Sequence, residues 1–126
     1  MLFRSFYFSV WAPNAKNVAV AGDFNGWSND SHKLFPRLDR SGIWEGFIPD
    51  VSKGDKYKYH IDAGNGNNIL KADPYAIYAE LRPATASVAW NSAYQWNDKK
   101  WMSSRKKHNA LNAPWNVYEK IGRAHV

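Results

Sequence analysis

Hydrophobic and polar residues alternate along three stretches of the chain, and this alternation predicts β-strands. At residues 6–11, bulky apolar side chains recur at every second position, and residues 43–48 alternate again. The clearest case is 56–62, where Tyr57, Tyr59 and Ile61 alternate with lysine and histidine. A period of two places successive side chains on opposite faces of a strand, so each stretch is expected to bury one face.

Shorter strands are expected between these stretches, at 18–21, 69–71 and 85–90. A weak strand at 33–38 contains Pro36, which cannot donate to a ladder, so we place it at a sheet edge. Many short strands separated by turns predict an all-β fold, an antiparallel β-sandwich.

Glycine, asparagine and aspartate mark the turns between the predicted strands. Asn25-Gly26 forms a turn signal with aromatic residues on both sides, and 64–67 (GNGN) is expected to be a hairpin tip. No helical period of useful length occurs before Trp96. Beyond it, residues 98–107 predict a short basic helix.

The aromatic content is high for a chain of 126 residues, with 7 Trp, 7 Tyr and 6 Phe. Such residues either build a β core or present flat ring faces to a ligand. Trp11 lies in an alternating strand, and we expect its ring in the core. Trp27 follows a turn from which a ring can project, so structural packing and ligand contact both stay open for it.

The formal net charge of +6 raises nucleic acid as a partner. The basic residues cluster near the C-terminus, however, and a charge run of this kind is typical of a solvated segment. We therefore expect no nucleic-acid partner. A single-stranded nucleic-acid binder that stacks bases on aromatic rings is the alternative, and a steep loss of affinity with salt would identify it.

The chain contains no cysteine, no long apolar run and no secretory pattern near Met1. Disulfides are thereby excluded. We expect no membrane partner and a cytoplasmic location.

Both ends resemble translated sequencing adapter. Residues 121–126 (IGRAHV) and 1–5 (MLFRS) match the translations of a common adapter sequence and of its reverse complement. We expect both to be scars outside the fold. Without Arg4 and Arg123, the net charge falls from +6 to +4 (6 − 2).

Several motifs together resemble a known family. Residues 10–15 (VWAPNA), 20–27 (VAGDFNGW), 42–45 (GIWE) and 54–59 (GDKYKY) resemble carbohydrate-binding module family 48, the N-terminal domain of branching and debranching enzymes. Residues 71–76 (KADPYA) and 80–87 (ELRPATAS) narrow the resemblance to bacterial glycogen (1,4-α-glucan) branching enzymes. The resemblance implies an immunoglobulin-like sandwich.

The resemblance also implies a glucan site. In glycogen-binding modules the residue matching Trp27 stacks on glucose, and the lysine matching Lys58 binds sugar hydroxyls. Trp44, in a matched stretch, and Asn67, at the expected hairpin tip, complete our candidate set. Leu70 and Ser87 depart from the pattern, because those modules have a second stacking Trp and a sugar-binding Asn there. Weak α-glucan binding is therefore expected.

The resemblance gives the following domain boundaries. Residues 6–90 form the sandwich, and 91–120 form a basic linker and the first strand (116–119) of a catalytic (β/α)8 barrel. That barrel is the expected partner of the sandwich. A pair of carboxyl groups flanking the glycosidic bond is needed for glycosyl transfer, and none is evident. We expect no catalytic residues, no metal and no cofactor in this chain, and no activity from it alone.

Two other interpretations stay open. The chain could be a free glycogen-binding regulatory module, although the linker-like residues 96–119 argue against this. It could also be the equivalent domain of a pullulanase- or isoamylase-type debranching enzyme.

Overall fold

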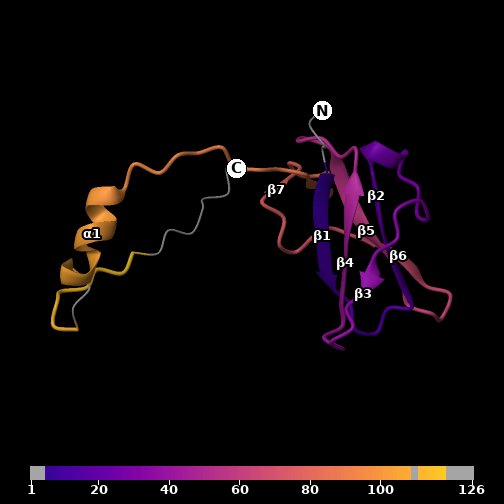
Figure 1. The fold of residues 1–126 in the computed structure, drawn as a ribbon, viewed down its shortest axis with the longest axis horizontal. Coiled ribbons are helices and arrows are strands. Elements are labelled where there is room, and N and C mark those ends of the chain that lie inside the picture. Colours follow the sequence, from indigo (N-terminus) through magenta and orange to yellow (C-terminus); the bar gives the residue numbers. More distant parts are fainter. Residues whose placement is uncertain (1–4, 109–110, 119–126) are drawn as a thin grey trace. The chain divides into compact units, whose positions relative to one another are not determined.

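The computed structural model describes residues 5–108 and 111–118. The chain divides into two compact units, residues 1–92 and 93–126. Figure 1 shows the first as two layers of β-strands and the second as a short helix with extended segments. The first unit is the all-β sandwich that the alternation predicts.

One layer is a three-stranded antiparallel sheet in the order β1-β4-β3. β1 (Ser5–Trp11) pairs along its whole length with β4 (Ile43–Pro49), and β3 (Phe35–Pro36) covers part of the other side of β4. The inner face of this layer carries Phe8 and Ile48, which are both buried. The strand that contains the proline is at the edge, as predicted.

The other layer is a five-stranded sheet centred on β5 (Lys56–Asp62). β2 (Asn17–Gly22) pairs with one side of β5. On the other side, β6 (Asn68–Lys71) pairs with one half of β5 and β8 (Ser87–Val88) with the other half. β7 (Tyr78–Ala79) then pairs with β8.

The hydrophobic core lies between the two sheets. Tyr57 and Tyr59 of β5 are buried there, as their alternation with polar residues predicts, and they pack with side chains from both layers. The buried cluster consists of Phe8, Val18, Val20, Leu34, Ile48, Val51, Tyr57, Tyr59 and Ala89. Burial of apolar area at roughly 25 cal/mol per Å² is the main force that holds such layers together.

Trp11 is not in the core, and our expectation for it was wrong. Its side chain is 69% exposed, and its indole N–H donates to the Ser41 carbonyl oxygen at 3.1 Å. The reason is strand parity. Phe8 and Val10 point inward, so Trp11 belongs to the opposite set and lies on the outer face of its sheet.

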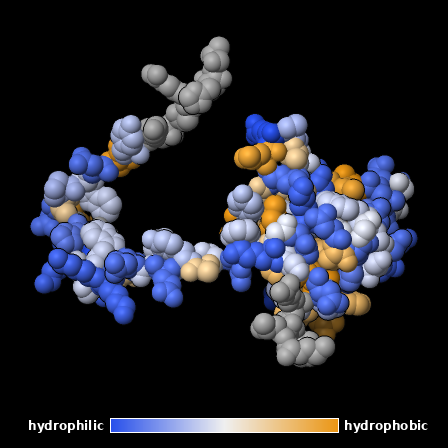
Figure 2. Space-filling model, turned by 90° about the horizontal axis from the view of Figure 1, so that it is seen from above, coloured by the Kyte–Doolittle hydropathy of each residue, from blue (hydrophilic) through white to orange (hydrophobic). Residues whose placement is uncertain are grey.

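The second unit contains α1 (Lys99–His108), close to the predicted basic helix. None of its residues is buried, and Figure 2 shows mostly hydrophilic colours on this helix. Val117 and Tyr118 are not in a strand. Glu119, the last residue of the expected barrel strand, lies outside the described residues, as do residues 1–4 and 121–126 of the expected adapter scars. The remaining scar residue, Ser5, begins β1.

Candidate functional site

A tight turn follows β2 and is fixed by the side chain of Asn25. The turn contains a short 3-10 helix, η1 (Asp23–Asn25). The Asn25 side-chain oxygen accepts from the Gly22 N–H at 3.0 Å, and its amide nitrogen donates to the Val20 carbonyl at 2.8 Å. A Cβ at Gly22 would lie 2.5 Å from the Lys56 carbonyl oxygen, so only glycine fits there. The expected turn role of these residues is confirmed.

Trp27 is held at the end of this turn in an unusual backbone conformation. Its φ is 61°, in the left-handed region that large side chains rarely occupy. Its N–H donates to the Gly22 carbonyl at 2.9 Å, and its indole N–H donates to Asp23 Oδ1 at 3.0 Å. The side chain is 38% exposed. The ring is therefore fixed in orientation while part of it faces solvent.

Asp23 also connects the turn to the five-stranded sheet. Its second carboxylate oxygen accepts from the Lys56 N–H at 2.9 Å, at the start of β5. The same carboxylate thus orients the Trp27 ring and attaches the turn to the strand that carries Lys58.

Lys58 lies on the side of the five-stranded sheet that faces away from the core. We call this side the outer sheet face; it carries Asn17, Ala19 and Ala21 from β2, Lys58, His60 and Asp62 from β5, and Asn68 and Leu70 from β6. The Lys58 ammonium group donates to Thr85 Oγ1 at 2.7 Å. This contact extends the amine across the sheet toward β8. Lys58 lies two residues along β5 from Lys56, to which Asp23 attaches the Trp27 turn.

The other two candidates lie elsewhere. Trp44 is on the inner side of β4 in the three-stranded sheet, partly buried against the core, and its indole N–H donates to the Ala12 carbonyl at 3.1 Å. Asn67 is at the hairpin tip between β5 and β6, where its N–H donates to the Asn65 side chain at 3.1 Å. Asp23 connects Trp27 to the start of β5, the strand that carries Lys58, whereas Trp44 belongs to the other sheet.

The two departures from the family pattern differ structurally. Leu70 is 45% exposed on the outer sheet face, where it pairs in register with His60. Ser87 is only 1% exposed, and its hydroxyl accepts from the Asp73 N–H at 2.8 Å. Leu70 can therefore offer apolar contact to a ligand, whereas Ser87 supports the Asp73 turn from inside.

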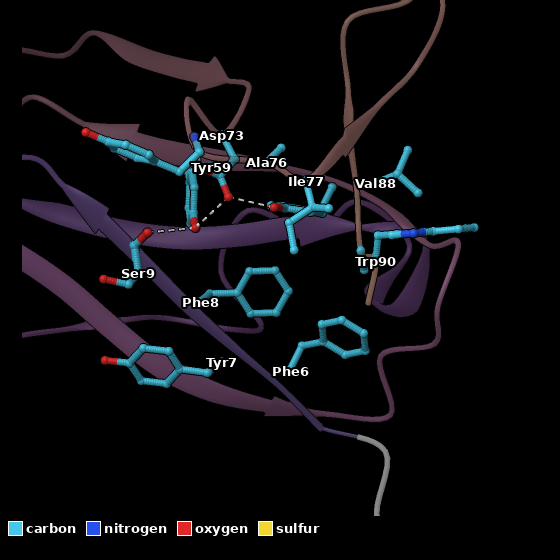
Figure 3. A pocket seen from close by; sticks show the side chains of 13 residues that line it. Phe6, Tyr7, Phe8, Ser9, Tyr59, Asp73, Ala76, Ile77, Val88 and Trp90 are labelled. Carbon is cyan, nitrogen blue, oxygen red and sulfur yellow. Dashed lines mark hydrogen bonds between the residues drawn. The ribbon is translucent and has the colours of Figure 1, made fainter. Parts of the chain in front are cut away.

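Asp73 is the centre of a polar cluster that sequence reasoning missed. Its Oδ2 accepts from the Tyr57 hydroxyl at 2.6 Å and lies 3.4 Å from the Tyr59 hydroxyl. The Tyr59 hydroxyl also donates to the Ser9 carbonyl of β1 at 3.0 Å, so it joins the two sheets, as Figure 3 shows. Alternation predicted that these tyrosines are buried. Their contacts with Asp73 could not be predicted, because no local sequence pattern indicates a hydrogen bond to a residue that is distant in the sequence.

Burial raises the pKa of both tyrosine hydroxyls. For Tyr57, desolvation is the largest cause, and the hydrogen bond to Asp73 adds to it. For Tyr59, desolvation again leads, followed by the negative charge of Asp73. The two hydroxyls line a pocket of about 230 Å³ between the sheets, together with Phe6, Ile77 and Trp90. Both tyrosines are protonated donors at neutral pH, which suits a structural role.

The described residues include no group of three or more His, Cys, Asp or Glu side chains that could hold a metal ion. Within residues 5–108 and 111–118, no helix is long and apolar enough to cross a membrane.

Two packed antiparallel sheets of short strands place the first unit in the class of small β-sandwich domains. The family follows from comparison. Residues 3–76 match the family model described as carbohydrate-binding module 48 (isoamylase N-terminal domain). That match covers more than half of the chain, so the chain belongs to this family, and the family predicted from the motifs is confirmed.

The chain is also homologous to curated branching enzymes. It is 55% identical over 113 residues to the 1,4-alpha-glucan branching enzyme GlgB of Aromatoleum aromaticum, covering 90% of this chain and 18% of that protein. It is 43% identical over 117 residues to GlgB 1 of Clostridium perfringens (strain 13), covering 92% and 17%. The chain thus spans less than a fifth of the length of these relatives.

Solved structures confirm the fold. Pullulanase from Bacillus acidopullulyticus superposes with a TM-score of 0.57 at 22% identity, over 71% of this chain and 11% of that one. Klebsiella pneumoniae pullulanase complexed with maltotriose gives 0.54 at 21% identity, over 69% and 9%. At these identities the likeness is one of fold.

Proposed function

We propose that this chain is the N-terminal accessory domain of a 1,4-α-glucan branching enzyme and that it guides α-glucan chains toward a catalytic barrel. One observation carries the proposal, namely the 55% identity to GlgB over 113 residues. A match of that length cannot fit within the 92 residues of the sandwich unit. It therefore includes part of the second unit, which supports a common origin for both units in such an enzyme.

Trp27 is the residue that would contact glucan most directly. A pyranose has an apolar face, and a ring that stacks on it buries area while the sugar hydroxyls stay free for polar partners. The indole N–H of Trp27 is already bound by Asp23, so its exposed ring surface is what remains for a ligand. Lys58, whose ammonium group has donors beyond its bond to Thr85, would bind sugar hydroxyls nearby.

Glucan binding should be weak, because Leu70 occupies the position at which glycogen-binding modules have a second stacking tryptophan. An aromatic stacking contact is worth roughly 1–3 kcal/mol, by analogy with bases on aromatic side chains. A single ring is consistent with a role in which the domain orients glucan chains rather than retaining them. The catalytic carboxylates would then be supplied by the barrel, which is the proposed second partner of the domain.

The test is replacement of Trp27 by glycine. Glycine removes the ring and adopts a φ of 61° without strain, and this relief offsets part of the stability that is lost with the ring's packing and its bond to Asp23, so the fold should persist. We expect the affinity for maltoheptaose, measured by calorimetric titration of the full chain, to fall about tenfold.

The matched control is Trp11→Gly, which removes an exposed ring from the outer face of the other sheet. It should leave the affinity unchanged. An equal loss of affinity in both variants, or a Trp27→Gly variant that binds glucan as well as the parent, would contradict the assignment of Trp27.

A further inference from the structure

The chain contains two Asn-Gly pairs, and the fold holds their side chains differently. Asn25-Gly26 lies in the turn after β2, and Asn65-Gly66 lies at the hairpin tip between β5 and β6. Both glycines have a positive φ, 62° at Gly26 and 84° at Gly66, and open space where a Cβ would lie. The difference between the two pairs therefore lies in the asparagine side chains.

An asparagine that precedes glycine can lose its side-chain amide without an enzyme. The backbone nitrogen of the glycine, once it has lost its proton, attacks the side-chain carbonyl carbon Cγ. The new N–Cγ bond closes a five-membered succinimide, and the Cγ–Nδ2 bond breaks as Nδ2 takes up a proton and leaves as ammonia. Water then opens the ring at one of its two carbonyl groups, which gives aspartate or isoaspartate. Glycine favours the first step because it has no Cβ to shield its nitrogen.

At the hairpin tip, the groups that take part in this reaction are accessible. Asn65 and Gly66 are both exposed. The Asn65 side-chain oxygen accepts from the Asn67 N–H at 3.1 Å, so a donor already faces the oxygen on which negative charge develops when Cγ is attacked. Within the described part of the chain, neither the leaving nitrogen Nδ2 of Asn65 nor the attacking Gly66 nitrogen makes a hydrogen bond. No bond to Nδ2 or to the Gly66 nitrogen has to be broken before the ring closes.

In the other pair, hydrogen bonds hold both ends of the Asn25 amide. Its oxygen accepts from the Gly22 N–H at 3.0 Å. Its Nδ2 donates to the Val20 carbonyl at 2.8 Å and lies 2.9 Å from His32 Nδ1. The side chain is also partly buried. Turning Cγ toward Gly26 and releasing Nδ2 requires these bonds to break, and each slows the reaction by about three- to tenfold.

We propose that Asn65 is a site of spontaneous deamidation and that the fold protects Asn25 from the same reaction. The product carries an additional negative charge at the hairpin tip. Isoaspartate also adds a backbone methylene between Ala63 and Asn67, whose N–H···O=C bond of 3.2 Å closes the hairpin. The inference is independent of the proposed glucan function, because it needs only the two side-chain environments.

The experiment follows both pairs in the full chain by mass spectrometry. The folded protein is incubated in neutral and in mildly alkaline buffer, digested at acidic pH and sequenced by fragmentation, which locates each conversion of amide to acid. Asn65 should convert at least about tenfold faster than Asn25, and isoaspartate should be among the products. The rate at Asn65 should rise with pH, because the attacking nitrogen must first lose its proton.

Incubation in guanidinium chloride is the matched control, because unfolding frees both side chains while the sequence stays the same. The two pairs should then react at similar rates. The variant Asn65→Gln lengthens the side chain by one carbon, so a five-membered ring cannot close, and conversion at this position should become far slower. A folded chain in which Asn65 stays intact, or in which Asn25 reacts as fast, would overturn the proposal. A rate difference that persists unchanged after unfolding would overturn the claim that the fold protects Asn25.

Discussion

At the scale of single residues, Trp27 combines backbone strain with a fixed side chain. A left-handed conformation costs a non-glycine residue roughly 1–2 kcal/mol. Here it is held by the bonds to Gly22 and Asp23. Strain that persists because its surroundings enforce it is a feature of ligand sites, and here it places a partly exposed ring beside the sheet. The sequence predicted the turn from which this ring projects, but the positive φ could not be predicted from Asn25-Gly26, because it depends on the Asp23 contact.

The Tyr57 and Tyr59 hydroxyls predict a loss of stability at alkaline pH. Both folded-state pKa values are raised above the ordinary value of 10.0. Their contribution is therefore complete below about pH 10 and is lost as the pH rises further, because the unfolded tyrosines ionise first. We expect the free energy of unfolding to fall by about 1 kcal/mol per tyrosine between about pH 10 and pH 11.

Urea unfolding across this range tests the prediction, with Tyr57→Phe as the reference. Lys56 also has a raised pKa, chiefly through its hydrogen bond with Glu80, so the parent has more than one source of alkaline instability. Phenylalanine removes only the tyrosine contribution, and the decline should be shallower in this variant. Identical slopes in the two proteins would show that the Tyr57 hydroxyl is not responsible.

At the scale of elements, alternation predicted the long strands and turn chemistry predicted their connections. Alternation failed to predict the strands that are too short to show a two-residue period. β7 has two residues and was not expected, and β8 is two residues long instead of the predicted six at 85–90. Both exist because β5 and the Asp73 turn supply partners from elsewhere in the chain. Trp11 lies outside the core because it shares the parity of Tyr7 and Ser9, whose side chains point outward.

The two units predict different amide exchange. α1 has no buried residue, and Trp96, Trp101 and Trp115 are largely exposed, so ordering this segment gains little burial against a backbone entropy cost of roughly 1–2 kcal/mol per residue. Deuterium exchange should therefore be fast across residues 97–118 and slow across 56–61. Exchange that is equally slow in both segments would show that the second unit is stabilised on its own, which would favour the free-module interpretation.

At the scale of the whole molecule, the basic net charge and the many aromatic rings are compatible with two classes of ligand, nucleic acid and glucan. The salt dependence of the binding affinity distinguishes them. A nucleic-acid binder releases counterions and loses affinity steeply as salt rises, whereas stacking on a pyranose face barely responds. The polar side chains beside the outer sheet face include both donors and acceptors, which suit a sugar. Family membership supports the same choice.

The most direct test of the account is a nitrogen-15 chemical-shift map of the full chain during titration with maltoheptaose, at about 50 mM and about 500 mM salt. We predict that shifts concentrate on the Trp27 indole N–H and around Lys58, and that the affinity is the same at both salt concentrations. Shifts confined to the outer face of the three-stranded sheet, around Tyr7, Trp11 and Phe47, or no shifts at high glucan concentration, would contradict the claim that this chain binds α-glucan through its outer sheet face.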